Sequence, residues 1–349
     1  MKVYLLPPNG SFYKANLHSH STVSDGQWTP EEMKENYKAH GYSIVAYTDH
    51  QVFLPHNELA DENFLPLNGY EVDIPEDKPW GFTTKTCHFC LIALDKDRTL
   101  QKIYHDSIYI DRIKDKVDID KSREPIKRVY DQEFISSLME EARKDGFFVT
   151  YNHPVWSLED KDEYLKYHGM HAFEIVNYGS YVTGHEERNS ALYDNMLLNG
   201  QNVYCIAADD NHNVCSMDSP HCDSFGGFTM IKADRLEYGT VTKALVDGHF
   251  YASEGPKIYD LYYDTEDELF HIKTSDAVRI VLTSGKRYNY VSTAKYKGDV
   301  ITEATFKLRA GSNGYVRFIV RDRDGKQAYT HAYDLSNVLS KNGENDVIL

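Results

Sequence analysis

The stretch "NLHSHSTVSDG", residues 16–26, carries two histidines two positions apart and an aspartate five positions further on. Alternate side chains of an extended chain point to the same face. His18 and His20 therefore project together, as two ligands of one metal ion would. The aspartate, Asp25, precedes Gly26, so a simple turn at this position is the alternative explanation.

Strand-like and helix-like segments alternate around this stretch up to about residue 255. Apolar runs that end in polar residues predict strands, as in "YSIVAYTDH" (42–50), "FFVTYNHP" (147–154) and "NVYCIAADDNH" (202–212). Capping residues and apolar stripes predict helices, as in "TPEEMKENYKAHG" (29–41) and "DQEFISSLMEEARKDG" (131–146). The alternation predicts an α/β fold with a largely parallel sheet, and a count of roughly seven or eight strands favours a distorted TIM-like barrel.

The pattern changes after about residue 255. Segments such as "DAVRIVLTSG" (276–285) and "YVRFIVRDRDGKQAYTH" (315–331) alternate apolar and polar residues, and "RDG" offers an Asp-Gly turn. We therefore expect a barrel domain over residues 1–255 and a small antiparallel β domain over residues 256–349. Residues 95–130 have the least regular pattern and predict an insertion over one end of the barrel, either a lid or a long loop.

Composition excludes several classes of protein. No apolar run reaches the roughly 18 residues of a membrane span, and the N-terminus has no signal-peptide core, which indicates a cytoplasmic protein without membrane contacts. Five scattered cysteines do not form a disulfide framework. The net charge of -16 and the lack of a long Lys/Arg cluster disfavour binding of duplex nucleic acid, although a small nucleotide remains a possible substrate.

Histidines and carboxylates recur at the ends of the predicted segments. Imidazole and carboxylate together suit Zn, Mn or Fe, and nine such groups exceed the ligand number of one ion. The "CHFC" segment also permits a zinc knuckle, but it has the pattern of a strand, in which positions three apart face opposite sides. The nine candidate metal ligands are His18, His20, Asp25, His50, Glu71, His88, His153, Asp210 and His212.

The ordered series of motifs resembles the PHP family, named for polymerase and histidinol phosphatase. The matching motifs over residues 12 to about 255 are "HSHSTVSDG", "YTDH", "GYEVD", the His of "CHF", "NHP" and "DDNH". The segment "GHFYASEGPKI" and the β-rich tail also look like the branch of the family that cleaves nucleotides and phosphoesters. His88 opens its predicted strand instead of closing it, so its assignment rests on the resemblance alone.

The resemblance implies a distorted barrel of about seven strands that holds three divalent ions. The first ion would be bound by His18, His20, Glu71 and Asp210. The second would share Glu71 and add His88 and His153, and the third would be bound by Asp25, His50 and His212. Three divalent ions and three carboxylates leave a net charge of about +3, which suits a phosphate ester.

The expected reaction is hydrolysis of a small phosphomonoester or nucleotide by a metal-bound hydroxide, since the metals lower the pKa of bound water. Arg188, with His185 behind it, is the candidate clamp for the phosphate, unless Arg188 only pairs with a glutamate of its own helix. Lys85 is a further candidate. The alternatives are metal-dependent hydrolysis of a non-phosphate bond, as in amidohydrolases, and a non-catalytic metal-binding module. The pattern does not determine the native metal or the oligomeric state.

Overall fold

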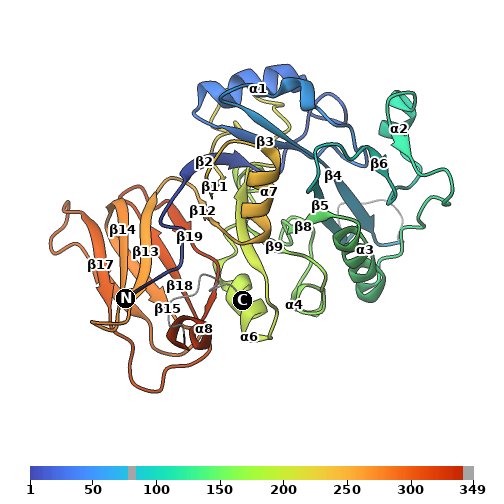
Figure 1. The fold of residues 1–349 in the computed structure, drawn as a ribbon. Coiled ribbons are helices and arrows are strands. Elements are labelled where there is room, and N and C mark those ends of the chain that lie inside the picture. The colour runs from blue at the N-terminus through green and yellow to red at the C-terminus, as the bar shows by residue number, and fades with distance from the viewer. Residues whose placement is uncertain (78–83, 341–349) are drawn as a thin grey trace.

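The computed structural model describes residues 1–77 and 84–340, which form a mixed α/β fold built on one large sheet. Figure 1 shows this sheet running through the molecule, with the C-terminal strands at one side of the molecule. The first part of the sheet has the strand order β10 (Tyr204–Ala208), β9 (Ala172–Asn177), β8 (Phe147–Asn152), β5 (Thr86–Ala93), β4 (Leu65–Pro75), β3 (Ile44–Tyr47), β2 (Ser11–Asn16), β11 (Phe228–Ala233) and β12 (Phe250–Ser253).

Helices cover this part of the sheet, as the alternating pattern predicts. The two most clearly capped helices begin where expected: Thr29 and Glu32 form a capping box before α1 (Pro30–Ala39), and Asp131 caps α3 (Gln132–Lys144). α1 packs on β3, α3 on β5 and β8, α6 (Ser190–Leu198) on β9, and α7 (Tyr238–Val246) on β8 and β11. The shorter helices are η1 (Asn57–Leu59), α4 (Lys161–Tyr164), α5 (Tyr178–Val182) and α8 (Leu335–Ser340).

The sheet is more mixed than the largely parallel one that the sequence predicts. The pairs β2–β3, β3–β4, β8–β9 and β9–β10 are parallel, whereas β5 is antiparallel to both β4 and β8, and β11 is antiparallel to β2 and β12. Only ten residues separate Pro75 from Thr86, too few for the crossover that a parallel partner needs. The chain therefore reverses direction between β4 and β5.

The sheet curls strongly, but main-chain pairing does not close it into a barrel within the described residues. One buried hydrophobic cluster joins strands that are far apart in the order of the sheet. It includes Ile206 of β10, Ile92 of β5, Leu17 after β2 and Phe250 of β12, together with Val241 of α7. β10 meets β11 through the Thr229 side chain, whose hydroxyl lies 2.9 Å from the Ala207 carbonyl oxygen. The closed barrel that the sequence favours is therefore not shown.

The C-terminal strands form antiparallel sheets. β19 (Gln327–Tyr329), β18 (Tyr315–Arg321), β15 (Arg279–Thr283) and β16 (Tyr290–Thr293) extend the large sheet beyond β12, and β20 (Tyr333–Asp334) pairs with β18. A separate sheet has the order β1 (Lys2–Tyr4), β13 (Ile258–Asp264), β14 (Leu269–Ala277) and β17 (Ile301–Phe306). The N-terminal strand β1 thus lies among the C-terminal strands (Figure 1).

The division into domains 1–255 and 256–349 stays a prediction, and residues 341–349 of the second lie outside the described residues. The insertion at 95–130 contains β6 (Leu100–Gln101), α2 (Ile108–Ile113) and β7 (Asp118–Ile119), so it has more regular structure than its sequence indicates. Among the described helices, none combines the length and the apolar character that crossing a membrane requires.

Candidate metal centre

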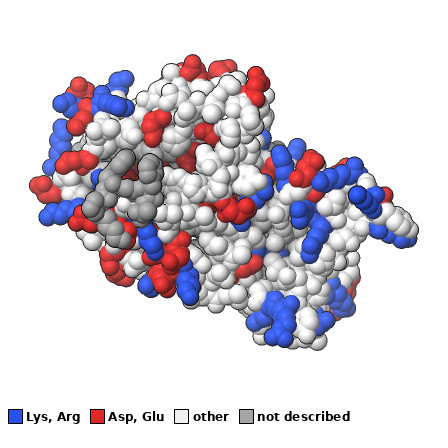
Figure 2. Space-filling model, turned by 180° about the vertical axis from the view of Figure 1, so that it is seen from behind, with Lys and Arg blue, Asp and Glu red and all other residues white. Residues whose placement is uncertain are grey.

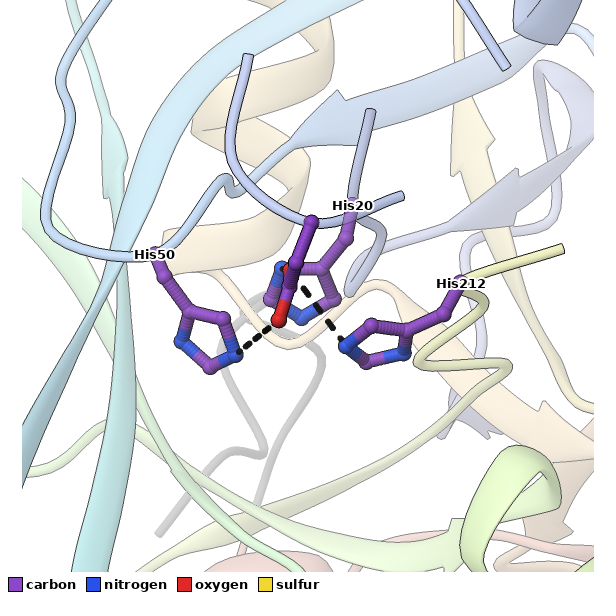
Figure 3. A group of neighbouring side chains, drawn as sticks. His20, His50 and His212 are labelled. Atoms are coloured by element: carbon purple, nitrogen blue, oxygen red, sulfur yellow. Dashed lines mark ion pairs between the residues drawn. The ribbon is translucent and has the colours of Figure 1, made fainter. Parts of the chain in front are cut away.

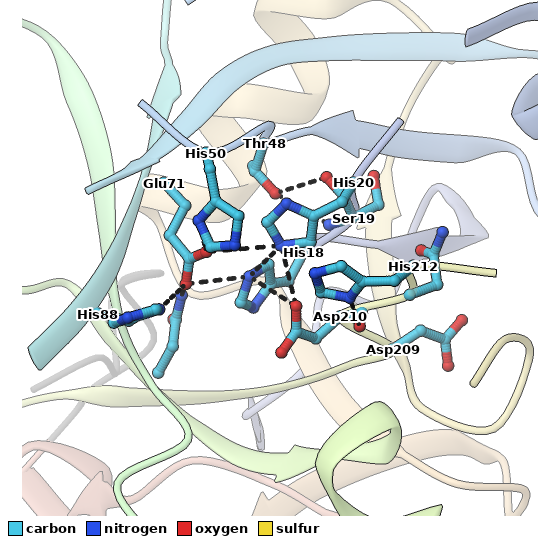
Figure 4. Close-up of polar contacts among 12 residues, drawn as sticks. His18, Ser19, His20, Thr48, His50, Glu71, His88, Asp209, Asp210 and His212 are labelled. Atoms are coloured by element: carbon cyan, nitrogen blue, oxygen red, sulfur yellow. Dashed lines mark hydrogen bonds and ion pairs between the residues drawn. The ribbon is translucent and has the colours of Figure 1, made fainter. Parts of the chain in front are cut away.

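The nine predicted ligands meet at one edge of the large sheet. His18 and His20 follow β2, His50 follows β3, His153 follows β8, and Asp210 and His212 follow β10, while Glu71 lies within β4. Because the carboxyl ends of parallel strands lie at the same edge, these side chains come from distant segments into one place. Figure 4 shows most of them turned toward a common centre.

The reversed direction of β5 explains the position of His88. In an antiparallel strand, the amino end lies beside the carboxyl ends of its neighbours. His88 pairs in register with Asp73 of β4 and Asn152 of β8, and Asn152 directly precedes His153. His88 therefore reaches the same edge of the sheet as the other candidate ligands, although it lies near the amino end of its own strand.

Glu71 is the centre of the cluster. Its side chain is fully buried, and five histidines lie within 3.5 Å of its carboxylate oxygens. Oε1 lies 3.1 Å from Nδ1 of His88, 3.2 Å from Nε2 of His18 and 3.3 Å from Nε2 of His153; Oε2 lies 3.0 Å from Nδ1 of His50 and 3.5 Å from Nε2 of His20. One carboxylate thus contacts histidines assigned to all three predicted ions.

Asp25 organises the more open side of the cluster. Its carboxylate lies 3.5 Å from Nε2 of His212, 3.7 Å from Nε2 of His50 and 3.9 Å from Nδ1 of His20. Figure 3 shows the rings of His20, His50 and His212 next to one another, and the centre of the His20 ring lies 4.3 Å from the centre of each of the other two. The side chains of Asp25 and His212 are 37% and 31% exposed, so this side of the cluster is open to solvent.

Asp210 completes the inner side. Its Oδ1 lies 2.9 Å from Nε2 of His20 and 3.2 Å from Nε2 of His18. Asp210 and His153 have positive φ angles of 53° and 28°, as does Gln51 beside His50 with 62°. Such angles are strained for residues other than glycine and cluster at functional sites.

The electrostatics of the cluster couple carboxylates to imidazoles. Burial raises the pKa of Glu71, but the neighbouring His18, His88 and His50 outweigh this effect and hold the pKa well below its ordinary value. Burial lowers the pKa of His153, but Glu71 and Asp210 raise it to about 9. His20 differs, because burial and the nearby His50 and His212 lower its pKa to about 4. Protons and cations therefore compete for the same nitrogens.

A second layer of buried side chains holds the ligands, and the sequence did not reveal it. Glu174 lies 3.1 Å from Nδ1 of His18 and accepts a hydrogen bond from the His153 backbone. Asn177 donates to both Glu174 and Asp210, at 2.9 and 3.0 Å. Both residues belong to "HAFEIVNYG", whose pattern predicts only a strand. Glu174 lies close enough to His18 and His153 to form a possible ligand group with them.

Asp49 and Asp209 support the loops that carry the ligands. Asp49 accepts hydrogen bonds from the backbone and hydroxyl of Ser21 and Ser24, which fixes the loop leading to Asp25. Asp209 accepts from three consecutive backbone groups, those of Phe225, Gly226 and Gly227. Asp49 therefore anchors the loop that carries Asp25.

Two aromatic side chains border the centre. Tyr109 of α2 places its hydroxyl 3.4 Å from Oδ2 of Asp25, and its ring stacks beside that of His50. Trp156, which is 42% exposed, packs edge-on against His88 and His153. The insertion at 95–130, which the sequence predicts as a lid or a long loop over one end of the barrel, therefore reaches the candidate site through Tyr109.

The predicted phosphate clamp has other partners. The Arg188 guanidinium pairs with Glu254 at 2.7 Å and lies over the Tyr181 ring, so its carboxylate partner comes from β12's end rather than from its own helix. The Nδ1 atom of His185 is buried and has no hydrogen-bond partner in the described structure. Lys85 pairs with Glu163 at 2.7 Å.

The "CHFC" segment lies in β5, as its strand pattern predicts, and both cysteines are buried. Cys90 lies close enough to His18 and Glu71 to form a possible ligand group with them, while Cys87 belongs to the hydrophobic core. The two thiols therefore face different surroundings, and a zinc knuckle does not form among the described residues.

The donor set fits divalent metal ions. Nine oxygen- and nitrogen-bearing side chains converge, and they include ligand groups such as His20, Asp25, His50 and His212. Nδ1 of His20 is buried without a hydrogen-bond partner, as expected for an atom that coordinates a metal. Imidazole and carboxylate ligands suit Zn, Mn or Fe.

Comparison with known proteins gives matches among solved structures. A two-domain protein from Bacteroides vulgatus ATCC 8482, described as containing a predicted PHP-like metal-dependent phosphoesterase, is 16% identical with a TM-score of 0.45, over 95% of this chain and 98% of that chain. A Bifidobacterium adolescentis ATCC 15703 protein, whose description proposes a metal-dependent phosphoesterase, is 15% identical with a TM-score of 0.37, over 61% and 91%.

A third match is an amidohydrolase from Chromobacterium violaceum with bound sulfate and no metal. It is 30% identical with a TM-score of 0.18, over 24% of this chain and 29% of that chain. No protein-family model and no curated protein matches the chain.

Proposed function

We propose that this chain is a metal-dependent phosphoesterase that hydrolyses a small phosphomonoester or a nucleotide. The observation that carries the proposal is the convergence of six histidines and three carboxylates, with the buried Glu71 at the centre. Bound divalent ions supply Lewis acidity, which activates water and neutralises charge on a phosphate ester. The descriptions of two structural neighbours as phosphoesterases are in keeping with this proposal.

The cluster is proposed to hold three ions, and Mn, Fe or Zn would suit its ligands. His18, His20, Glu71 and Asp210 would bind one ion, and Glu71, His88 and His153 a second. Asp25, His50 and His212 would bind the third, on the exposed side. Two groups of neighbouring ligand atoms, His18 with His20 and Asp210, and Asp25 with His20, His50 and His212, support the first and third sets. The proposal includes the fold that the sequence predicts for this part of the chain, a distorted barrel of about seven strands.

The protein's own residues would orient the substrate at the exposed side. Asp25 and His212 are the most accessible ligands, and the Tyr109 hydroxyl lies beside Asp25. A phosphate ester entering here meets a hydrogen-bond donor on one side and the ligand cluster on the other. The burial of His18, His20 and Glu71 keeps bulk water away from the inner part of the cluster.

The test is a hydrolysis panel on protein of measured metal content. Purified protein is supplied with Mn, Fe or Zn and offered a p-nitrophenyl phosphomonoester, a p-nitrophenyl phosphodiester, a p-nitroanilide and a lactone whose ring opening is followed with a pH indicator. Phosphoester cleavage is expected to fall at least about a hundredfold in the Glu71→Gln variant. Glu186→Gln, an exposed neutralisation outside the cluster, is the matched control. Cleavage of the amide or lactone alone, or activity that survives Glu71→Gln, contradicts the proposal.

Arg188 and His185 remain the proposed contacts for the phosphate. Replacing Arg188 with Met is expected to raise KM about tenfold with little change in kcat, because a clamp binds ground and transition states alike. Glu254→Gln frees the guanidinium from its ion pair and is expected to leave KM unchanged or lower. If both variants change only protein stability, Arg188 has a structural role and the clamp is wrong.

A further inference from the structure

The C-terminal strands carry a net positive charge, although the chain as a whole is acidic. Between Arg279 and Lys326 the sequence has eleven Lys or Arg and four Asp or Glu, a net charge of +7 in a chain whose total is -16. Such asymmetry between parts of a chain is typical of an anionic partner. Figure 2 shows many of the Lys and Arg side chains on the right-hand part of the molecule, seen from behind, where these strands lie.

The cations gather around the exposed end of the large sheet. β16 is the last strand in the order of the sheet, paired on one side with β15. Six exposed cationic residues lie on β15, on β18 and in the loops that flank β16. We call this set the basic edge; it consists of Arg279, Lys286, Arg287, Lys295, Lys297 and Arg321.

The basic edge is not neutralised by the protein itself. No ion pair involves any of its six members in the described part of the chain, whereas the nearby buried Arg317 pairs with Asp194 and Lys307 pairs with Glu268. Arg279 and Arg321 are direct cross-strand partners, an arrangement of like charges that destabilises a sheet. An anionic ligand across these strands would remove that repulsion.

Exposed tyrosines accompany the cations. Tyr288 and Tyr296 are 57% and 64% exposed and stand in the two loops on either side of β16. The Arg309 guanidinium lies 4.2 Å from the centre of the Tyr288 ring, and Lys295 lies 5.2 Å from that of Tyr296. Each ring therefore has a cation beside it and most of its surface open to solvent, which is the arrangement that binds a planar base next to a phosphate.

We propose that the basic edge binds single-stranded nucleic acid, with the cations along the phosphate backbone and Tyr288 and Tyr296 stacking on bases. A flexible strand suits the site because its bases are free to stack. A duplex would offer only phosphates, and the edge carries no helix to enter a groove. A membrane surface would call for exposed large aliphatic, Phe or Trp side chains, and Val291 is the one large aliphatic residue exposed along the described edge.

The linear sequence hides this surface, because its cations are spread over more than 40 positions and interrupted by buried strand residues. Only the antiparallel pairing of β16, β15 and β18 brings them together. The proposal concerns a surface separate from the metal cluster and does not depend on the proposed hydrolysis.

The test is fluorescence anisotropy with a labelled oligothymidylate of about 20 nucleotides, titrated with the full chain at about 50 mM and 200 mM salt. Binding is expected at the lower salt and should weaken steeply at the higher. The double variant Lys295→Glu with Lys297→Glu is expected to weaken binding at least tenfold. The salt slope is the slope of log K against log[salt], and each phosphate contact with a single strand contributes about 0.7 to its magnitude. If each lysine contacts one phosphate, the magnitude should therefore decrease by about 1.4 in the double variant.

Three further variants keep the result interpretable. Lys161→Glu with Lys166→Glu makes the same change in charge at exposed lysines of another surface and is expected to bind like the wild type. Tyr288→Ala with Tyr296→Ala retains the six cations and is expected to weaken binding about tenfold or more without altering the salt slope. Glu71→Gln should bind the probe as the wild type does, which separates this surface from the metal cluster.

Four outcomes would overturn the proposal. The first is the absence of binding at the lower salt concentration. The second is equal or tighter binding of a duplex of the same length, and the third is binding of phosphatidylglycerol vesicles but not of the oligonucleotide. Equal weakening by the control lysine pair would show that net charge alone is responsible, and it would also remove the basic edge as a binding site.

Discussion

The Glu174 carboxylate lies 3.1 Å from Nδ1 of His18, and both side chains are fully buried. Because a carboxylate accepts the hydrogen bond, the proton of neutral His18 resides on Nδ1, and the lone pair of Nε2 faces Glu71 and Asp210. The Asn177 amide joins the same carboxylate to Asp210. Glu174 thus orients one candidate ligand directly and, through Asn177, a second.

Replacing Glu174 with Ala is therefore expected to weaken metal binding about 10- to 100-fold, as losses of such outer partners do. Glu174→Gln should have a smaller effect, because an amide oxygen still accepts a hydrogen bond from Nδ1. Equilibrium dialysis with Mn or Zn measures the affinity without requiring activity, and Glu186→Ala serves as the exposed control. Complete loss of one bound ion in both variants would instead identify Glu174 as a ligand.

Metal binding is expected to release protons at neutral pH. Burial lowers the pKa of His50, but Glu71 and Asp25 raise it to about 9, and Glu71 and Asp210 likewise raise that of buried His153 to about 9. Both rings are therefore protonated at pH 7 in the metal-free protein and must lose a proton to coordinate. Calorimetric titration with Mn or Zn in buffers of different ionisation enthalpy should show release of at least about two protons.

The sign of this effect also predicts how affinity changes with pH. The affinity for the metal ion should increase from pH 7 toward pH 9, because fewer protons remain to be displaced from His50 and His153. Above the pKa of about 9 of these two rings, the affinity should become constant. A pH-independent affinity with no proton release would mean that these imidazoles are neutral before the metal binds, or that they are not ligands.

A buried carboxylate beside the His153 loop should make stability depend on pH. Tyr130, Tyr151 and Tyr167 donate hydrogen bonds to Glu159. Burial raises its pKa from 4.5 to about 7, in spite of these donors. As pH rises between these values, the unfolded chain releases its proton before the folded chain does. The contribution of Glu159 is therefore fully present below pH 4.5 and is lost above about pH 7.

The Glu159→Gln variant has no such proton. The stability of the wild type relative to this variant should therefore fall by about 3 kcal/mol between about pH 5 and pH 8. Urea unfolding of both chelator-treated proteins measures the difference, and Glu186→Gln should show the wild-type dependence on pH. Parallel stability curves for the wild type and Glu159→Gln would show that the folded-state pKa of this carboxyl is ordinary.

The sequence motifs predict the composition of the cluster well, because each ligand lies in a short polar segment beside an apolar strand. His18, His20 and Asp210 follow from the positions of strand ends, and the structure brings all nine candidates into one cluster. The direction of β5 was also available in principle, since the gap between Pro75 and Thr86 is too short for a parallel crossover.

Other features of the site and of the fold have no local sequence pattern that would predict them. Glu174 resembles any polar residue in a strand until the fold buries it beside His18, and Tyr109 belongs to an irregular insertion whose path depends on tertiary contacts. The pairing of β1 with β13 joins segments more than 250 residues apart. Sequence periodicity identifies strands, but it does not identify such distant partners.

One buried ion pair connects α6 to the C-terminal strands. Arg317 of β18 is fully buried, and its guanidinium binds the Asp194 carboxylate through Nε and Nη2, each at 2.8 Å. Nη2 also donates to the Ser190 hydroxyl at 2.8 Å. The two partners differ in environment, because the Asp194 side chain is 31% exposed while that of Arg317 is inaccessible.

This difference predicts unequal effects of removing the two partners. Asp194→Ala leaves a buried guanidinium without its counter-charge and should cost about 3 kcal/mol of unfolding free energy, the lower end for a broken buried pair. Arg317→Met leaves an aspartate that water can still reach and fills the vacated space with an apolar side chain, so it should cost less. Asp194→Asn should lie between them, because its amide oxygen still accepts a hydrogen bond. Chemical denaturation of the three variants gives the order, and a larger loss for Arg317→Met than for Asp194→Ala would show that packing of the arginine outweighs its charge.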